Sequence, residues 1–271
     1  MSTTKYFAPS VEYAAKILIY LSRYKSKQST LTEISKNLDI NKSACLRVLK
    51  TLEANNFVYY NSETKKYSLG TYISVLGKRV GENLDYLRII NQFLEEVCEL
   101  TGLTAALVQR VSFDRVMFIS QYQTQIQPRL SISVGNRFPL TEVSYGKWIL
   151  ANVSEEERNY HLREGLKKVT SYTRTNLQKY IDELSEIKRS NILVSRQEYT
   201  NNVTAISSAL YDWKGQILGM IALVGVSSLI DEAEEQRLCT VLKEVTNRCN
   251  EHLIQLKIEA YEFPYESKIT Q

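Results

Sequence analysis

Two short helical patterns separated by a very tight turn constrain the fold of this chain more than any other feature. Residues 31–38 and 42–55 each carry apolar residues at helical spacing, and only Asp39, Ile40 and Asn41 lie between them. Apolar residues three and four positions apart share one face of a helix. Two short helices joined by such a turn form a helix-turn-helix, whose second helix enters the major groove of DNA.

The segments on either side of this pair complete a larger motif. A first helix is predicted from Pro9, with Ser10 as its N-cap. Further along, the β-prone runs 57–60 and 65–70 flank a polar turn at 61–64 and predict a hairpin. A hairpin that directly follows a helix-turn-helix is the wing of a winged helix.

Positive charge is concentrated in this part of the chain. Residues 1–80 hold 13 Lys and Arg against 5 acidic residues, whereas residues 81–271 hold 21 against 25. The net charge of +4 therefore combines a basic quarter with a mildly acidic remainder. Local positive charge is what the neutralisation of DNA phosphates requires. A solvated basic surface is the alternative interpretation.

The recognition helix and the wing supply the candidate DNA contacts. Arg47 is placed for bidentate readout of guanine, and Lys50, one turn further along, for a phosphate contact. The wing lysines are placed for the backbone or the minor groove. For each basic residue, a solvated position is the alternative. The residues predicted to contact a double-stranded DNA operator are Thr32, Lys42, Ser43, Ala44, Arg47, Lys50, Lys65 and Lys66.

Length and hydropathy indicate the class of protein. A chain of 271 residues with 44% hydrophobic residues exceeds the usual size of one domain, so we expect two globular domains. The first ten residues lack the apolar core of a signal peptide. No run of about 18 uncharged apolar residues occurs, so we expect a cytoplasmic protein without a membrane span.

The placement of cysteine and histidine argues against a metal site or a disulfide framework. The four cysteines form no C-x-x-C pair, and His161 and His252 lie far apart. We expect structural cysteines, with redox sensing as the alternative, and no cofactor. The chain also has no nucleophile elbow and no phosphate-binding Gly-rich loop, which argues against an enzyme.

The ordered motifs of the first seventy residues resemble those of the IclR family of transcription regulators. They are Pro9-Ser10-Val11-Glu12, Leu31-Thr32-Glu33-Ile34-Ser35, Asn41-Lys42-Ser43, Arg47-Val48-Leu49 and Lys66-Tyr67-Ser68-Leu69-Gly70. The resemblance extends over most of the chain. It implies a homodimer, often paired into a tetramer as a dimer of dimers, in which a sensor domain controls operator binding, usually for repression.

The rest of the chain predicts a linker helix followed by an α+β domain. Residues 71–87 have a near-helical pattern interrupted by Gly77 and Gly81, which suits either close packing of two subunits or a hinge. Helices predicted near residue 144, over 177–187 and from residue 231 would flank an antiparallel sheet. Its predicted strands are 105–111, 115–122, 130–134, 192–198, 203–212 and 217–226. The predicted domains are a winged helix-turn-helix over 1–70, a linker helix over 71–87 and an effector-binding domain over 88–271.

Three segments of this second domain resemble the sensor signature of the family. They are Val134-Gly135 with Arg137 and Pro139-Leu140, then Gly146-Lys147, and Tyr211-Asp212 with Gly215. The resemblance implies a GAF-like fold that holds a small-molecule effector between sheet and helices. The residues expected around the effector are Leu130, Arg137, Leu140, Ser144, Tyr145, Ser195, Glu198, Ala205, Ser207, Ala222 and Val224. A carboxylate would suit the helix start at Ser144, where an ordinary capped helix is the alternative.

Departures from the family pattern bear on the effector. Ser195 stands where the family commonly has an acidic residue, Ala205 where a cysteine is frequent, and Thr141 where a histidine is usual. Two frequent serines align with Ala222 and Val224. A polar ligand head would lose hydrogen bonds here, at about 1–3 kcal/mol per unsatisfied group. We therefore expect an effector that is more apolar or aromatic than small hydroxy or keto acids, or a degenerate pocket in a regulator that needs no ligand.

Overall fold

The computed structural model describes residues 8–83, 85–125 and 127–260. The chain divides into two compact units, Met1–Leu84 and Asp85–Gln271. The elements of the N-terminal unit are α1 (Pro9–Leu21), a 3-10 turn (Tyr24–Ser26), β1 (Ser29–Thr30), α2 (Leu31–Leu38), α3 (Lys42–Ala54), β2 (Val58–Asn61), β3 (Lys66–Leu69) and α4 (Tyr72–Asn83).

Local sequence accounts for where the helices of this unit begin. Pro9 occupies the first turn of α1 and no side chain caps it, so the prediction of Ser10 as N-cap is wrong. Helix α2 begins with a capping box in which Thr30 and Glu33 each accept a hydrogen bond from the other's backbone N–H. The side chain of Asn41 caps α3.

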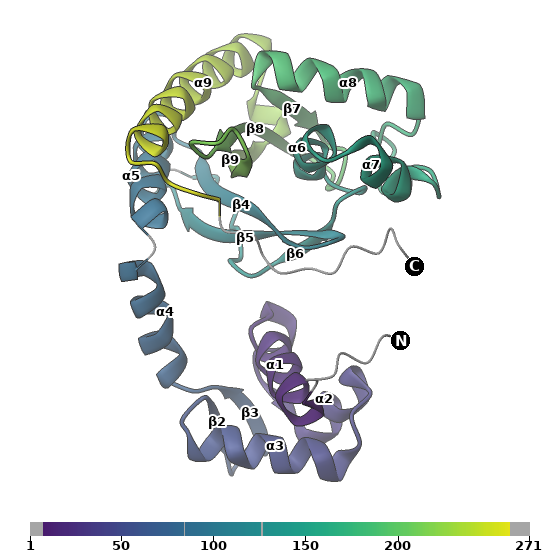
Figure 1. The fold of residues 1–271 in the computed structure, drawn as a ribbon, viewed down its shortest axis with the longest axis vertical. Helices are drawn as coiled ribbons and strands as arrows, with labels where there is room; N and C mark the ends of the chain where they lie inside the picture. Colours follow the sequence, from purple (N-terminus) through teal and green to yellow (C-terminus); the bar gives the residue numbers. More distant parts are fainter. Residues whose placement is uncertain (1–7, 84, 126, 261–271) are drawn as a thin grey trace. The chain divides into compact units, whose positions relative to one another are not determined.

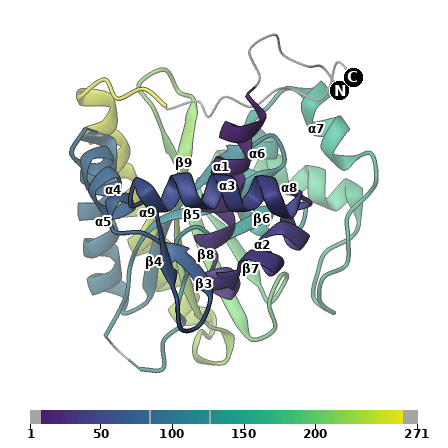
Figure 2. The same cartoon turned by 90° about the horizontal axis from the view of Figure 1, so that it is seen from below.

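The helix-turn-helix and the wing share one core. Ile17 of α1, Ile34 of α2 and Leu49 of α3 are completely buried. Seen from below, α3 lies across α1 and α2, and the β2–β3 hairpin extends beside one end of it (Figure 2). The hairpin has the predicted position, and β3 also pairs with the short strand β1, which was not predicted.

The C-terminal unit is an antiparallel sheet with helices on both faces (Figure 1). The strand order is β6-β5-β4-β9-β8-β7. Helices α5 and α9 pack together against one face. Helix α6 packs against the other face, and α7 and α8 contact α6. The elements are α5 (Asp85–Thr101), β4 (Thr104–Ser112), β5 (Arg115–Tyr122), β6 (Arg137–Pro139), α6 (Ser144–Asn152), α7 (Glu155–Leu162), α8 (Leu177–Ser190), β7 (Leu193–Arg196), β8 (Val203–Tyr211), β9 (Ile217–Val226), a 3-10 turn (Ser227–Leu229) and α9 (Glu232–Gln255).

Two predicted elements differ from the structure. The segment 130–134 is not a strand, because it runs irregularly along the wall of a cavity until Gly135 turns with a φ of 88° and donates to the carbonyl of Phe118. The pattern predicted as one linker helix over 71–87 forms α4 and the start of α5, and residue 84 between them lies outside the described residues.

Candidate DNA interface and effector pocket

Helix α3 presents a polar face that its buried face holds in place. Cys45, Val48, Leu49 and Leu52 anchor the helix in the core. The opposite face carries predicted DNA contacts, of which the exposed ones are Lys42, Ser43, Arg47 and Lys50.

The remaining predicted DNA contacts differ in their surroundings. Thr32 is exposed near the start of α2, and Ala44 is half-buried where α3 faces α1. Lys65 is exposed at the hairpin tip with a φ of 56°, and Lys66 is half-buried on β3.

Lys50 is held by two neighbours in the same unit. Its Nζ donates to Glu53 Oε2 at 2.8 Å and lies 5.4 Å from the centre of the Tyr60 ring. The hydrogen bond to Glu53 raises the pKa of Lys50. A phosphate contact by Lys50 would therefore compete with the Glu53 carboxylate.

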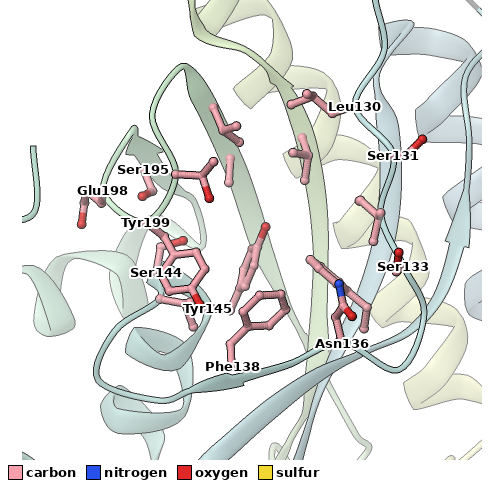
Figure 3. A pocket seen from close by; sticks show the side chains of 17 residues that line it. Leu130, Ser131, Ser133, Asn136, Phe138, Ser144, Tyr145, Ser195, Glu198 and Tyr199 are labelled. Atoms are coloured by element: carbon pink, nitrogen blue, oxygen red, sulfur yellow. The ribbon is translucent and has the colours of Figure 1, made fainter. Parts of the chain in front are cut away.

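The C-terminal unit contains a cavity of about 300 Å³ between the sheet and α6. Figure 3 shows Ser144, Tyr145, Ser195, Glu198 and Tyr199 along one side, with residues of the irregular segment opposite. The full lining is Phe118, Leu130, Ser131, Ile132, Ser133, Asn136, Phe138, Val143, Ser144, Tyr145, Ser195, Glu198, Tyr199, Thr200, Val203, Ala205 and Val224.

Seven of the eleven residues expected around an effector line this cavity. They are Leu130, Ser144, Tyr145, Ser195, Glu198, Ala205 and Val224. The other four do not line the cavity. Arg137 is exposed on β6, and Leu140 is buried in the core next to Gly146. Ser207 and Ala222 are also buried and do not reach the cavity.

The strand register explains this division on β8 and β9. Ala205 pairs with Val224, and two residues deeper Ser207 pairs with Ala222. Only the first pair reaches the cavity, because the buried ring of Trp148 donates from Nε1 to Ser207 Oγ at 2.9 Å. The expected residues thus lie on two strands that reach the cavity, but Trp148 of α6 covers the deeper pair.

The start of α6 offers unpaired polar groups to the cavity. Val143 is the N-cap and provides no side-chain cap. The N–H of Gly146 donates to the carbonyl of Val143 at 3.1 Å, which leaves the backbone N–H groups of Ser144 and Tyr145 for a ligand. Among the described residues, no side chain or backbone group forms a hydrogen bond with the hydroxyls of Ser144 or Tyr145. Burial raises the pKa of Tyr145, which keeps its hydroxyl protonated as a hydrogen-bond donor.

A buried ionic cluster supports the wall behind these groups. Lys147 Nζ donates to Glu183 Oε2 at 2.9 Å and to Glu198 Oε2 at 3.1 Å. Arg174 joins both carboxylates, at 3.1 Å to Glu183 Oε1 and 3.7 Å to Glu198 Oε1. Two positive and two negative groups balance, so the cluster leaves no net charge beside the cavity.

Several residues that line the cavity were not predicted from the sequence. Phe118 and Phe138 meet edge to face at 5.2 Å, and Phe138 meets Tyr199 in the same way at 5.5 Å. Alternation along β5 was a usable signal for Phe118, because Val116 and Phe118 lie two residues apart and are both buried. Tyr199 lies in a turn after β7, where no periodic pattern indicates which way a side chain points.

Two family models match the chain, one for each of its two units. The family model described as the IclR helix-turn-helix domain matches residues 10–62, and the one described as bacterial transcriptional regulator IclR C-terminal matches residues 79–250. The chain belongs to the IclR family. This confirms the predicted family and the predicted α+β class with an N-terminal helix-turn-helix.

Individual relatives of this IclR-family chain cover most of its length. The transcriptional repressor AllR of Escherichia coli strain K12 is 29% identical over 226 residues, 83% of each chain. An IclR transcriptional regulator from Alicyclobacillus acidocaldarius is 34% identical, with a TM-score of 0.86 over 91% of this chain and 99% of that one. The IclR of Thermotoga maritima, 23% identical with a TM-score of 0.68, shares the fold.

Membership of the IclR family makes the chain a DNA-binding transcription regulator and not an enzyme. Across the described residues, no helix combines the length and apolarity needed to cross a bilayer. Within the same residues, no group of three or more His, Cys, Asp or Glu side chains is arranged to hold a metal ion.

Proposed function

We propose that the protein is a cytoplasmic repressor whose operator binding through α3 is modulated by a small molecule in the C-terminal unit. The observation that carries the effector role is the cavity of about 300 Å³ into which the uncapped start of α6 opens. That volume lies within the range of ligand pockets, which combine apolar walls with a few convergent polar groups. The sensor role and the GAF-like fold of this unit belong to the same proposal.

The lining favours an aromatic or otherwise apolar effector with a small polar head. No Lys, Arg or His contributes to the wall, and the only ionised residue there, Glu198, is paired with Lys147. Phe118, Phe138 and Val224 supply an apolar surface for a ring or hydrocarbon body. A polar or anionic head fits the unpaired N–H and hydroxyl groups at the start of α6.

A homodimer is the proposed functional unit, and pairing of dimers into a tetramer is consistent with the family. Tyr72, Val75 and Leu76 of α4 are 46%, 49% and 42% exposed, and they lie three and four residues apart on one helix. An exposed apolar stripe of this kind suits a second copy of the same helix. Sedimentation analysis tests the assembly: a monomer at micromolar concentration, unaltered by Leu76→Glu, would contradict it.

The DNA-binding role of α3 is tested by selecting bound fragments from genomic DNA and measuring their affinity by electrophoretic shift. Arg47→Ala should weaken binding about 10- to 100-fold, because a bidentate contact to guanine is worth about 1–3 kcal/mol. Lys243→Ala is the matched control, since Lys243 is exposed on α9 of the other unit and its loss removes the same charge. Equal affinity of Arg47→Ala and the parent protein would refute the proposed contact.

The effector role is tested by thermal shift with small aromatic acids beside glyoxylate and pyruvate. Aromatic compounds should raise the melting temperature and change operator affinity, and Ala205→Leu, which fills the cavity from β8, should abolish both effects. A clear shift by glyoxylate or pyruvate would contradict the proposed class. If no compound acts and Ala205→Leu leaves operator binding intact, the chain regulates without a ligand, which is the second candidate function.

A further inference from the structure

One side chain on the exposed face of α3 has no role in the contacts described so far. Leu46 is 39% exposed, whereas Leu49 and Leu52 of the same helix are 0% and 7% exposed. It follows Ser43 by three residues and immediately precedes Arg47, so it occupies the N-terminal half of the helix, which meets base edges in a helix-turn-helix.

Its neighbours leave room for Leu46 to reach a base. Ser43 has a short side chain, and the ammonium of Lys50 is held by Glu53 and faces the Tyr60 ring. The long side chains at the middle of this face are therefore Leu46 and Arg47, both exposed.

We infer that Leu46 reads a thymine by contact with its 5-methyl group. A leucine side chain has neither donor nor acceptor, and the thymine methyl is the apolar group that unmodified DNA presents in the major groove. Against any other base edge, Leu46 would cover polar groups without replacing their hydrogen bonds to water. The inference rests on the proposed insertion of α3 in the major groove.

The adjacent position of Arg47 locates this thymine in the operator. Leu46 and Arg47 are separated along the helix axis by one residue, a rise of about 1.5 Å, which is less than the roughly 3.4 Å between stacked bases. The thymine read by Leu46 is therefore expected close to the guanine read by Arg47 in the same half-site. Leu46 and Arg47 together specify a short thymine- and guanine-containing step in each half-site.

The test replaces thymine with uracil, which lacks only the methyl group, at one position at a time in a duplex recovered by genomic selection. The parent protein should bind about fourfold more weakly at one position per half-site, the effect expected for loss of one buried methyl. Leu46→Ala should bind the thymine and uracil duplexes equally. Because Leu46 is partly exposed, this variant should melt with the parent protein.

Ser43→Ala and Lys50→Ala are the controls, since they remove other groups from the same helix face and leave Leu46 in place. Both should lower affinity for the thymine and uracil duplexes by the same factor and so retain the discrimination. Tolerance of uracil at every position by the parent protein, or unchanged discrimination by Leu46→Ala, would overturn this inference alone. Failure to select any DNA would overturn the insertion of α3 and this inference with it.

Discussion

Gly146 is the residue on which the start of α6 depends most closely. A Cβ atom at this position would collide with the backbone carbonyl group of Leu140, and backbone cannot move aside as the end of a long side chain can. Ser144 and Tyr145, which line the cavity, come directly before it. The close approach of two backbones therefore fixes where the polar end of the pocket lies.

Gly146→Ala should lower the free energy of unfolding of the C-terminal unit by at least about 2 kcal/mol, since the clash forces backbone displacement. Both tryptophans, Trp148 and Trp213, belong to this unit, so their fluorescence in urea measures it. Gly77→Ala is the control, because a Cβ atom there meets nothing within 4 Å. This variant should stabilise α4 by roughly 0.5–1 kcal/mol, as measured by unfolding followed with far-ultraviolet circular dichroism. Equal stability of Gly146→Ala and the parent protein would contradict this role.

The sequence indicated the helix start at Ser144 but not this close approach. A pattern of residues gives the phase of a helix or strand, and hence its buried face. It does not give the depth at which a neighbouring element covers that face. Ala205 and Ser207 illustrate the limit, because both lie on the predicted strand, yet Trp148 leaves only the first in the cavity.

Helix α6 connects the pocket to the outer helix α8 through one buried ammonium. Lys147 is 2% exposed, and its two carboxylate partners come from α8 and from the turn after β7. Removing one member of a buried ion pair leaves an uncompensated charge, which costs far more than the loss of an exposed pair. The cluster thus fixes the positions of α6, α8 and the turn after β7 relative to one another beside the cavity.

Lys147→Met should lower the free energy of unfolding by about 3 kcal/mol, because it leaves Glu183 and Glu198 with Arg174 alone. Lys167→Met tests the contrast, since Lys167 is 70% exposed in its pair with Glu142 and should contribute within about 0.5 kcal/mol. Urea unfolding followed by tryptophan fluorescence measures both. Similar decreases in the free energy of unfolding for the two variants would show that the buried cluster stabilises the protein no more than an exposed ion pair does.

Elements with a strong apolar pattern were predictable, and weakly patterned ones were not. Strands β5 and β9 have the predicted bounds, since their residues alternate or run apolar without interruption. Helix α7 was missed because three glutamates fill its first turn and only Leu162 is buried. The strand predicted over 130–134 is wrong because its apolar residues face a cavity instead of a neighbouring strand.

The stability of the C-terminal unit depends on pH through one half-buried histidine, His161. His161 of α7 stacks on Phe113 at 4.5 Å between the ring centres. Burial, followed by the positive charge of Arg110, lowers the pKa of His161 below its ordinary value of about 6.5. Below that pH the unfolded chain takes up a proton that the folded protein does not, so folding becomes less favourable.

The contribution of His161 to the free energy of unfolding should therefore be complete above about pH 6.5 and decline as the pH falls below that value. His161→Phe, which keeps an aromatic ring and removes the proton site, should flatten the decline in urea titrations. His252→Gln removes the other histidine, which is exposed on α9, and should retain it. A full decline in His161→Phe would show that other groups cause the pH dependence.

The sheet of the C-terminal unit ends on very short strands. Its outermost members, β6 and β7, contain three and four residues. Such edges offer few unpaired backbone groups as a template for another chain, so copies gain little by continuing the sheet. The proposed homodimer, which would form through α4, therefore has little competition from open-ended growth by strand addition.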